Sequence, residues 1–309
     1  FNVARALSGS EGTCAVILNI SARLVHSPPA RVLVVLGYPD IFTAGDAVKD
    51  ILPFGPIALE GFDDRVVASM RKKRLFLNDL PLLPDGRGWL VVEFGAESVP
   101  EAEDLASRLM HAVQGMRPAP TARLFTDPRE QARVWGVREA GLGASAFPPG
   151  EPPTWEGWED AAVPPERVGD YLRDLSVLLE RYGYQTGFYG HIGQGCLHNR
   201  INFDLETAPG IEKFRGFLEH AADLVVSYGG SISGEHGDGQ ARAELLPRMF
   251  GTELVEAFRE FKTIWDPQGK MNPGKLIDPY PLDRNLRLGP GFSLPTVATQ
   301  FAFPDDGGS

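Results

Sequence analysis

Two histidines, His191 and His198, lie seven residues apart in the glycine-rich stretch 190–198. If Gln194 and Gly195 form the two-residue tip of a β-hairpin, the two imidazoles lie opposite each other on one face. The Cβ atoms of opposed residues are about 5 Å apart, which lets both rings bind a single metal ion. The spacing therefore predicts a metal site on a hairpin. Two histidines on a hairpin without a functional role remain the alternative.

A second group of reactive side chains follows in the segment 231–239, whose sequence is Ser-Ile-Ser-Gly-Glu-His-Gly-Asp-Gly. Its glycines permit positive φ and a close approach of the backbone to a ligand. Glu235 and His236 are neighbours, so one can complete a metal site while the other meets a substrate. Two imidazoles and one carboxylate with an open position form the ligand set of a catalytic Zn, Mn or Fe site. By itself the loop is a weak signal, because such loops are common.

Two further segments have motif-like sequences. Residues 265–276 contain Asp-Pro-Gln-Gly and Asn-Pro-Gly-Lys, which predict two turns after a helix. Residues 8–13 form a loop of small residues before an expected strand at 15–20, where backbone N–H groups could face a ligand oxygen. A plain turn is the alternative for this loop.

Apolar periodicity and turn residues predict the elements that position these segments. Strands are expected at residues 31–37, 56–60, 89–94, 122–125, 186–192 and 196–203, and helices at residues 43–52, 99–116, 127–139, 166–182, 211–228, 242–250 and 254–265. Residues 143–165 contain six prolines and predict a long loop. The mixture indicates an α+β fold with a ferredoxin-like sheet, single or doubled, and helices on one face.

Composition narrows the class of protein. The chain has 309 residues, 43% of them hydrophobic, and a net charge of -11, which is typical of a globular protein and unfavourable for nucleic acid or a membrane surface as partner. The basic run 71–74 is expected to be a solvated face, with an acidic partner as the alternative. Two distant cysteines and no long apolar segment favour the cytoplasm, and peripheral attachment at the inner face of the membrane stays open.

Together the four segments resemble the C-terminal part of FAD-linked oxidases of the vanillyl-alcohol oxidase superfamily, in the branch of the D-lactate dehydrogenases and glycolate oxidases. The resemblance lies in Gly9-Ser10-Glu11-Gly12-Thr13, Gly190-His191 to His198, Ser233-Gly234-Glu235-His236-Gly237 and Asn272-Pro273-Gly274-Lys275, in the family's order. Two positions depart from the family pattern. Gln194 stands where the family usually has Asp, and Cys196 where it usually has Asn.

The resemblance implies an FAD-dependent dehydrogenase that acts on D-lactate or a similar 2-hydroxy acid. It implies FAD and a divalent metal, Zn, Mn or Fe, as cofactors. His191, His198 and Glu235 would be the metal ligands, and His236 the base that takes the proton of the substrate hydroxyl. The α-hydride would pass to the flavin.

The resemblance also implies roles for residues outside the two central motifs. Arg138, at a position where the family often has an arginine, and Arg200, which shares a strand face with His198, would bind the substrate carboxylate. Four residues would lie near the flavin or its domain: Glu11, Gly12, Asn272 and Lys275.

The same resemblance divides the chain. Residues 1–25 would be the end of an FAD-binding domain, 26–276 the substrate or cap domain, and 277–309 a tail toward a further domain. An iron–sulfur domain or another electron acceptor would be the partner, and a homodimer through an apolar surface around the Gly190 hairpin is a further expectation. A metal-dependent hydrolase and a binding module without catalysis are the alternative functions. The departures at Gln194 and Cys196 give the binding module some weight.

Overall fold

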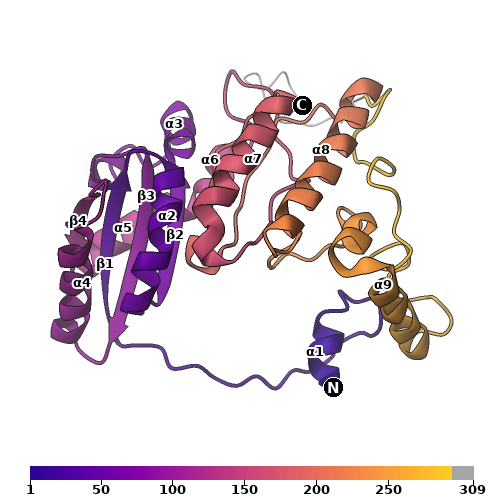
Figure 1. Cartoon of the computed structure of the whole chain (residues 1–309), viewed down its shortest axis with the longest axis horizontal. Coiled ribbons are helices and arrows are strands. Elements are labelled where there is room, and N and C mark those ends of the chain that lie inside the picture. The colour runs from indigo at the N-terminus through magenta and orange to yellow at the C-terminus, as the bar shows by residue number, and fades with distance from the viewer. Residues whose placement is uncertain (294–309) are drawn as a thin grey trace, which may run out of the picture.

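The computed structural model describes residues 1–293, and its centre is one antiparallel sheet of five strands (Figure 1). The spatial order is β4-β1-β3-β2-β5. The strands are β1 (Ala30–Tyr38), β2 (Ala58–Asp63), β3 (Gly88–Ala96), β4 (Thr121–Phe125) and β5 (Tyr189–Gly190). The predicted α+β class is confirmed, with a single sheet among the described residues.

Helices cover both faces of this sheet, whereas the sequence analysis placed them on one. One core joins the sheet to α2 (Ile41–Ile51), α4 (Val99–Val113), α7 (Val168–Tyr182) and α8 (Ala208–Ser227), and the other to α3 (Asp64–Lys73), α5 (Pro128–Glu139) and α6 (Gly141–Ser145). The reason lies in β1, where Val32 and Val34 enter the first core and Leu33 and Val35 the second. A continuous apolar run is typical of a strand buried on both sides.

Local sequence explains where the helices begin and end. The Asp127 side chain accepts a hydrogen bond of 2.8 Å from the backbone N–H of Arg129 and caps α5, which begins with Pro128. Helix α7 ends at Gly183, whose φ of 64° is the left-handed conformation that glycine favours. Both boundaries were predicted from the sequence and are confirmed.

The remaining helices extend the molecule away from the sheet. Helix α7 packs on α2, α8 on α7, and α9 (Leu246–Trp265) on α8, while α1 (Val3–Ser8) lies beside α9 (Figure 1). Helix α9 is interrupted by a kink at Gly251, whose φ of 75° and ψ of 161° are not helical, so two helical segments meet there, as the expected helices at 242–250 and 254–265 require. Short 3-10 turns lie at Leu52–Phe54, Leu80–Leu82, Pro165–Arg167, Ile192–Gln194 and Ala243–Leu245.

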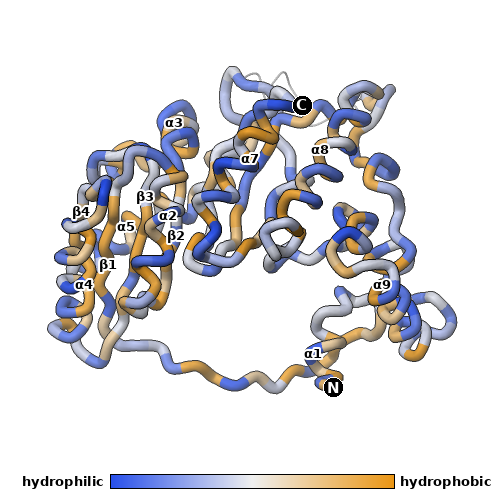
Figure 2. Tube along the Cα trace, in the orientation of Figure 1, coloured by the Kyte–Doolittle hydropathy of each residue, from blue (hydrophilic) through white to orange (hydrophobic). Residues whose placement is uncertain are grey.

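Three predicted strands differ from the structure. Residues 15–20 pair with no strand, and the chain from α1 to β1 carries exposed apolar residues along much of its length (Figure 2). Within 186–192 and 196–203 only β5 joins the sheet, because the backbone of residues 195–201 bonds instead to the proline-rich loop. Among the described residues, no helix combines the length and the apolar character needed to cross a membrane.

Part of the basic run 71–74 anchors the proline-rich loop and does not simply face solvent. The ammonium of Lys73 donates to the carbonyl of Gly143 at 2.7 Å and also to that of Ala146. Lys72 pairs with Glu151 in the same loop. These contacts hold the loop against α3.

Candidate active site

The hairpin that contains His191 and His198 brings their two imidazoles together, but with a strand register and a turn that differ from the prediction. Tyr189, and not His191, pairs with His198, and the two backbones exchange hydrogen bonds of 2.6 and 3.1 Å. The 3-10 turn Ile192–Gln194 lengthens the tip, so the predicted two-residue turn and its register are wrong. The ring centroids of His191 and His198 nevertheless lie 5.2 Å apart.

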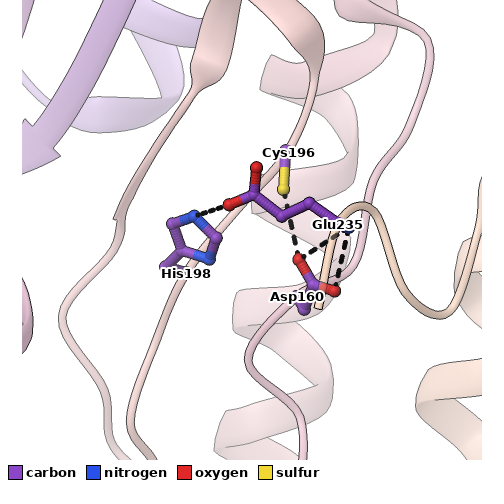
Figure 3. A group of neighbouring side chains, drawn as sticks. All are labelled: Asp160, Cys196, His198 and Glu235. Atoms are coloured by element: carbon purple, nitrogen blue, oxygen red, sulfur yellow. Dashed lines mark hydrogen bonds and ion pairs between the residues drawn. The ribbon is translucent and has the colours of Figure 1, made fainter. Parts of the chain in front are cut away.

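The loop 231–239 brings one carboxylate oxygen to three imidazoles. Glu235 Oε1 lies 3.3 Å from Nε2 of His191, 3.1 Å from Nε2 of His198 and 3.4 Å from Nε2 of His236. Figure 3 shows the Glu235 carboxylate directed at His198 from the neighbouring loop. The four side chains that the sequence analysis selected for metal binding and proton transfer therefore converge on one point.

Each of the three rings has an acceptor at its other nitrogen. Nδ1 of His191 lies 2.8 Å from Glu60 Oε1, that of His198 lies 3.0 Å from the carbonyl of Glu159, and that of His236 lies 2.7 Å from the Glu159 carboxylate. An imidazole that donates from Nδ1 presents the lone pair of Nε2, which is the usual arrangement of metal-binding histidines.

This donor set fits a divalent cation. Three nitrogen lone pairs and a carboxylate oxygen repel one another at these distances unless a cation lies among them or the rings carry protons. Imidazole and carboxylate ligands suit Zn, Mn and Fe alike. The chemistry of the site is thus consistent with the metal that the resemblance implies.

Asp160, fully buried, holds the loop that carries Glu235. Its carboxylate accepts from the Ser233 hydroxyl at 2.6 Å and from the backbone N–H groups of Glu235 and His236 at 3.1 and 2.7 Å. Burial acts to raise the pKa of Asp160, but these hydrogen bonds outweigh it and hold that pKa below its usual value. Asp160 therefore remains an acceptor that fixes the backbone beside the site.

The Cys196 thiol lies 3.4 Å from Oδ1 of Asp160, and ligand atoms of Asp160, Cys196, His198 and Glu235 all lie within 4.8 Å of one another (Figure 3). Burial and the negative charge of Asp160 both raise the pKa of this thiol. Cys196 therefore donates to Asp160 as a neutral thiol.

Glu159 and Arg242 support His236 from behind. Arg242 is buried and donates to Glu159 Oε1 at 2.8 Å, while Glu159 Oε2 faces His236. Burial lowers the pKa of His236, but the adjacent carboxylates, above all Glu159, outweigh burial and raise it. Because Nδ1 of His236 faces Glu159, its Nε2 points toward Glu235.

The two arginines expected at the substrate carboxylate are both buried and each forms an ion pair with a glutamate. Arg138 is buried and donates through Nε and Nη2 to Glu60 Oε2 at 3.0 and 2.6 Å. Arg200 is buried as well and pairs with Glu156, and its Nε has no hydrogen-bond partner within the described part of the chain. Arg138 reaches His191 through Glu60, so it contacts the site indirectly.

The residues expected near the flavin gather on the outer side of the loop 231–239. The Glu11 carboxylate accepts from the backbone N–H groups of Asp238 and Gly239, and the Asn272 amide donates to the Glu11 carbonyl at 3.2 Å. Lys275 pairs with Gln240, and Gly12 has a φ of 69° beside Glu11. The structure therefore brings these residues together at one edge of the candidate site.

Sequence reasoning missed four supporting residues: Glu60, Glu159, Asp160 and Arg242. The sequence offered one faint signal for Glu60, a charged residue at the end of the apolar run 56–60. For Glu159 and Asp160 no pattern marks the contact, because the proline-rich loop has no regular period. Arg242 follows the loop 231–239, and nothing in its sequence neighbourhood indicates that it contacts Glu159.

Comparisons with known proteins identify the family of the chain. A family model described as "FAD linked oxidases, C-terminal domain" matches residues 27–276. D-2-hydroxyglutarate dehydrogenase of Pseudomonas putida is 28% identical over 95% of this chain and 30% of its own length. D-lactate dehydrogenase of Archaeoglobus fulgidus is 31% identical over 90% of this chain and 58% of its own, and the glycolate oxidase protein GlcD of Escherichia coli is 28% identical over 90% and 54%.

The chain thus spans under a third of the hydroxyglutarate enzyme and about half of the other two relatives. Among solved structures, p-cresol methylhydroxylase with bound substrate has a TM-score of 0.54 at 12% identity, over 81% of this chain and 53% of that one. The 4-ethylphenol oxidase from Gulosibacter chungangensis has a TM-score of 0.52 at 14% identity, over 82% and 55%. These likenesses show the fold alone. Since the family model covers about four fifths of the sequence, the chain belongs to the family of FAD linked oxidases, C-terminal domain.

Proposed function

We propose that this chain is the substrate-binding and metal-binding part of an FAD-dependent dehydrogenase that oxidises a 2-hydroxy acid. The observation that carries the proposal is the convergence of three imidazole Nε2 atoms on Glu235 Oε1. The names of the relatives support the substrate class, because D-2-hydroxyglutarate, D-lactate and glycolate are all 2-hydroxy acids.

In this proposal His191, His198 and Glu235 hold the metal. A bound divalent metal would lower the pKa of the substrate hydroxyl, and bound FAD would accept the hydride from the α-carbon. His236 takes the hydroxyl proton on Nε2, which its bond to Glu159 leaves free to accept. The hydroxy acid loses one proton and one hydride and becomes a 2-oxo acid.

Arg138 and Arg200 are proposed to orient the substrate carboxylate. A planar guanidinium binds a carboxylate with two parallel hydrogen bonds. Arg200 has a free Nε for this purpose, whereas Arg138 acts through Glu60 or by exchanging that partner.

We also retain the proposed division of the chain. Residues 1–25 complete an FAD-binding domain, 26–276 form the substrate domain and 277–309 lead toward a further domain. The proposed electron acceptor is an iron–sulfur domain or another redox partner. Residues 294–309 of the tail lie outside the described residues.

Elemental analysis of the purified chain tests the metal centre. We expect about one tightly held divalent ion per chain, lost in His198→Ala because its Nε2 faces Glu235. His26→Ala is the matched control, since His26 is exposed and pairs only with Glu97 within the described residues. Unchanged metal content in His198→Ala would remove His198 from the ligand set.

The base is tested in the complete flavoprotein. His236→Ala should bind flavin normally and reduce it with a 2-hydroxy acid about 10²-fold or more slowly, because the proton acceptor is missing. Fast flavin reduction in this variant would overturn the role of His236. Hydrolytic activity that is independent of flavin would favour the hydrolase.

A further inference from the structure

Glu11 makes a long-range contact with the loop that carries the candidate site. It lies after α1 and 227 residues before Asp238 in the sequence. Its two carboxylate oxygens accept hydrogen bonds from the consecutive backbone N–H groups of Asp238 and Gly239, each at 2.7 Å. Hydrogen bonds to an ionised carboxylate are stronger than those between neutral groups, and adjacent N–H groups form a natural anion site.

The shape of the loop depends on this carboxylate. Gly237 has a φ of 88°, and a Cβ atom at this position would lie 2.8 Å from Glu11 Oε1. Only glycine combines this backbone conformation with such a close approach. The loop and Glu11 are therefore complementary in shape as well as in charge.

The segment that contains Glu11 is itself fixed to the rest of the molecule. The Asn272 amide donates to the Glu11 carbonyl at 3.2 Å, and the Lys262 ammonium of α9 donates to the Thr13 carbonyl at 2.6 Å. Lys262 also pairs with Asp266 at 2.9 Å. Glu11 thus presents its carboxylate from an anchored backbone.

We infer that Glu11 is a positioning residue for the metal centre, and that it acts by holding the loop that carries Glu235 and His236. Asp160 binds the backbone N–H groups of those two residues, and Glu11 binds those of Asp238 and Gly239 in the same loop. Both carboxylate oxygens of Glu11 accept hydrogen bonds from the loop, so the carboxylate holds the loop in place. The metal-related part of the inference rests on the proposed function.

Two variants of the full chain test this role. Glu11→Ala removes both acceptors, and Glu11→Gln keeps one oxygen and the size of the side chain. We expect exchange of the Asp238 and Gly239 amide hydrogens to be about 10-fold or more faster in Glu11→Ala, with Glu11→Gln between it and the wild type. Glu97→Gln is the control, because Glu97 is exposed and pairs only with His26 within the described residues.

Metal affinity provides the second measurement. Supporting residues around a metal site typically change affinity 10- to 100-fold, so we expect about a 10-fold loss in Glu11→Ala and a smaller loss in Glu11→Gln. The thermal unfolding of the sheet should be unchanged, because Glu11 belongs to neither hydrophobic core. If the contact of Glu11 were purely structural, Glu11→Ala would loosen the loop and leave metal affinity unchanged.

The outcomes separate the inference from the proposed function. Unchanged amide exchange in Glu11→Ala overturns the contact as a determinant of the loop. Faster exchange with unchanged metal affinity overturns the positioning role. If the wild-type chain binds no metal, the proposed metal centre fails, and so does the role of Glu11 in positioning that centre. Amide exchange still decides in that case whether Glu11 holds the loop.

Discussion

Glu60 serves two partners with a single buried carboxylate. It accepts from Nδ1 of His191 at 2.8 Å and from Arg138 at 2.6 Å, and the side chains of Glu60 and Arg138 are only 9% and 8% exposed. Removing one partner of a buried ion pair leaves an uncompensated charge. Glu60 therefore links the stability of the protein to the orientation of His191, a proposed metal ligand.

We predict that Glu60→Gln lowers the free energy of unfolding by about 3 kcal/mol, because the Arg138 charge stays buried without its partner. It should also weaken metal binding about 10-fold, since His191 loses its orienting carboxylate. Urea unfolding and metal titration measure the two effects. Glu97→Gln makes the same change at an exposed pair and should alter stability by about 0.5 kcal/mol or less. Equal effects of both variants would contradict the prediction.

The proposed metal-binding and proton-accepting residues were easier to predict from the sequence than the residues that hydrogen-bond to them. His191, His198, Glu235 and His236 stand in compact motifs, and the structure brings all four together. Their partners are distant in sequence: Glu60 lies 131 residues before His191. A single glutamate in a strand carries no sign of what it faces, so such a contact becomes visible only in the folded chain.

At the scale of elements, the hairpin shows how tertiary contacts override a local pattern. The Leu197 N–H bonds to the Ala161 carbonyl at 2.9 Å, and the Val163 N–H bonds to the Gly195 carbonyl at 3.0 Å. The second predicted strand therefore pairs with the proline-rich loop and not along the whole hairpin. Turn residues indicated a hairpin, but they contain no information about this competing partner.

Gly195 is where the hairpin approaches the proline-rich loop most closely, and this leads to a second prediction. It has a φ of 74°, and a Cβ atom there would lie 1.8 Å from the Val163 carbonyl oxygen. Gly229 is the matched control, with a φ of 70° and nothing within 4 Å. Alanine at either position costs about 1–2 kcal/mol in the left-handed conformation. At Gly195 the clash should add a further 1–3 kcal/mol or so.

Chemical denaturation of Gly195→Ala and Gly229→Ala measures this difference directly. A larger loss of stability at Gly195 is the expected result, because only that variant must push the Val163 backbone aside. Equal losses would show that the hairpin and the proline-rich loop separate at little cost.

Asp63 joins two elements and gives the fold a dependence on pH. Its carboxylate caps α3 by accepting from the Val66 N–H and holds the approach to β5 by accepting from the Phe188 N–H, both at 2.9 Å. Burial raises the pKa of Asp63 to about 7, although these two bonds act in the opposite direction. In an unfolded chain the pKa of aspartate is about 3.9.

An acid whose pKa rises on folding stabilises the fold while it is protonated. The contribution of Asp63 to the free energy of unfolding should therefore be highest below about pH 4, and it should fall by up to about 1.4 kcal/mol per pH unit as the pH rises from about 4 to about 7. Asp63→Asn cannot ionise, so its unfolding free energy should depend less on pH in this window. Urea unfolding across the window measures the slopes, with Asp104→Asn as the control at an exposed site. A slope in Asp63→Asn equal to that of the wild type would refute the prediction.

For the whole molecule, the fold class followed from strands and helices of clear period, whereas the arrangement of layers did not. The run Val32–Leu36 is apolar at every position, and this pattern already favours burial on two faces. Periodicity gives the type of each element but leaves open which helix covers which face. The family resemblance, carried by four motifs in order, identified the family but not the layers, and the family match over residues 27–276 confirms the family.

The exposed apolar surface of the molecule lies elsewhere than expected. Around the Gly190 hairpin, Tyr189, Ile192 and Leu197 are buried, so this region offers little apolar area for a homodimer. A run of exposed apolar side chains lies instead in the unpaired stretch between α1 and β1, where Leu18 is 86% and Ile20 is 79% exposed. Extended apolar backbone without a partner strand is prone to pair with another chain.

We therefore predict that the 309-residue chain self-associates through this stretch and not through the hairpin. Sedimentation velocity should show an apparent mass that rises with concentration for the wild type and stays at the monomer value for Leu18→Asp combined with Ile20→Asp. Burying each of these side chains is worth about 1.5–3 kcal/mol, so their replacement should weaken association at least about 10-fold. Val177→Asp places the same charge at an exposed position of α7 and should associate like the wild type. Association that persists in the double variant would assign it to another surface, such as the apolar face of α9.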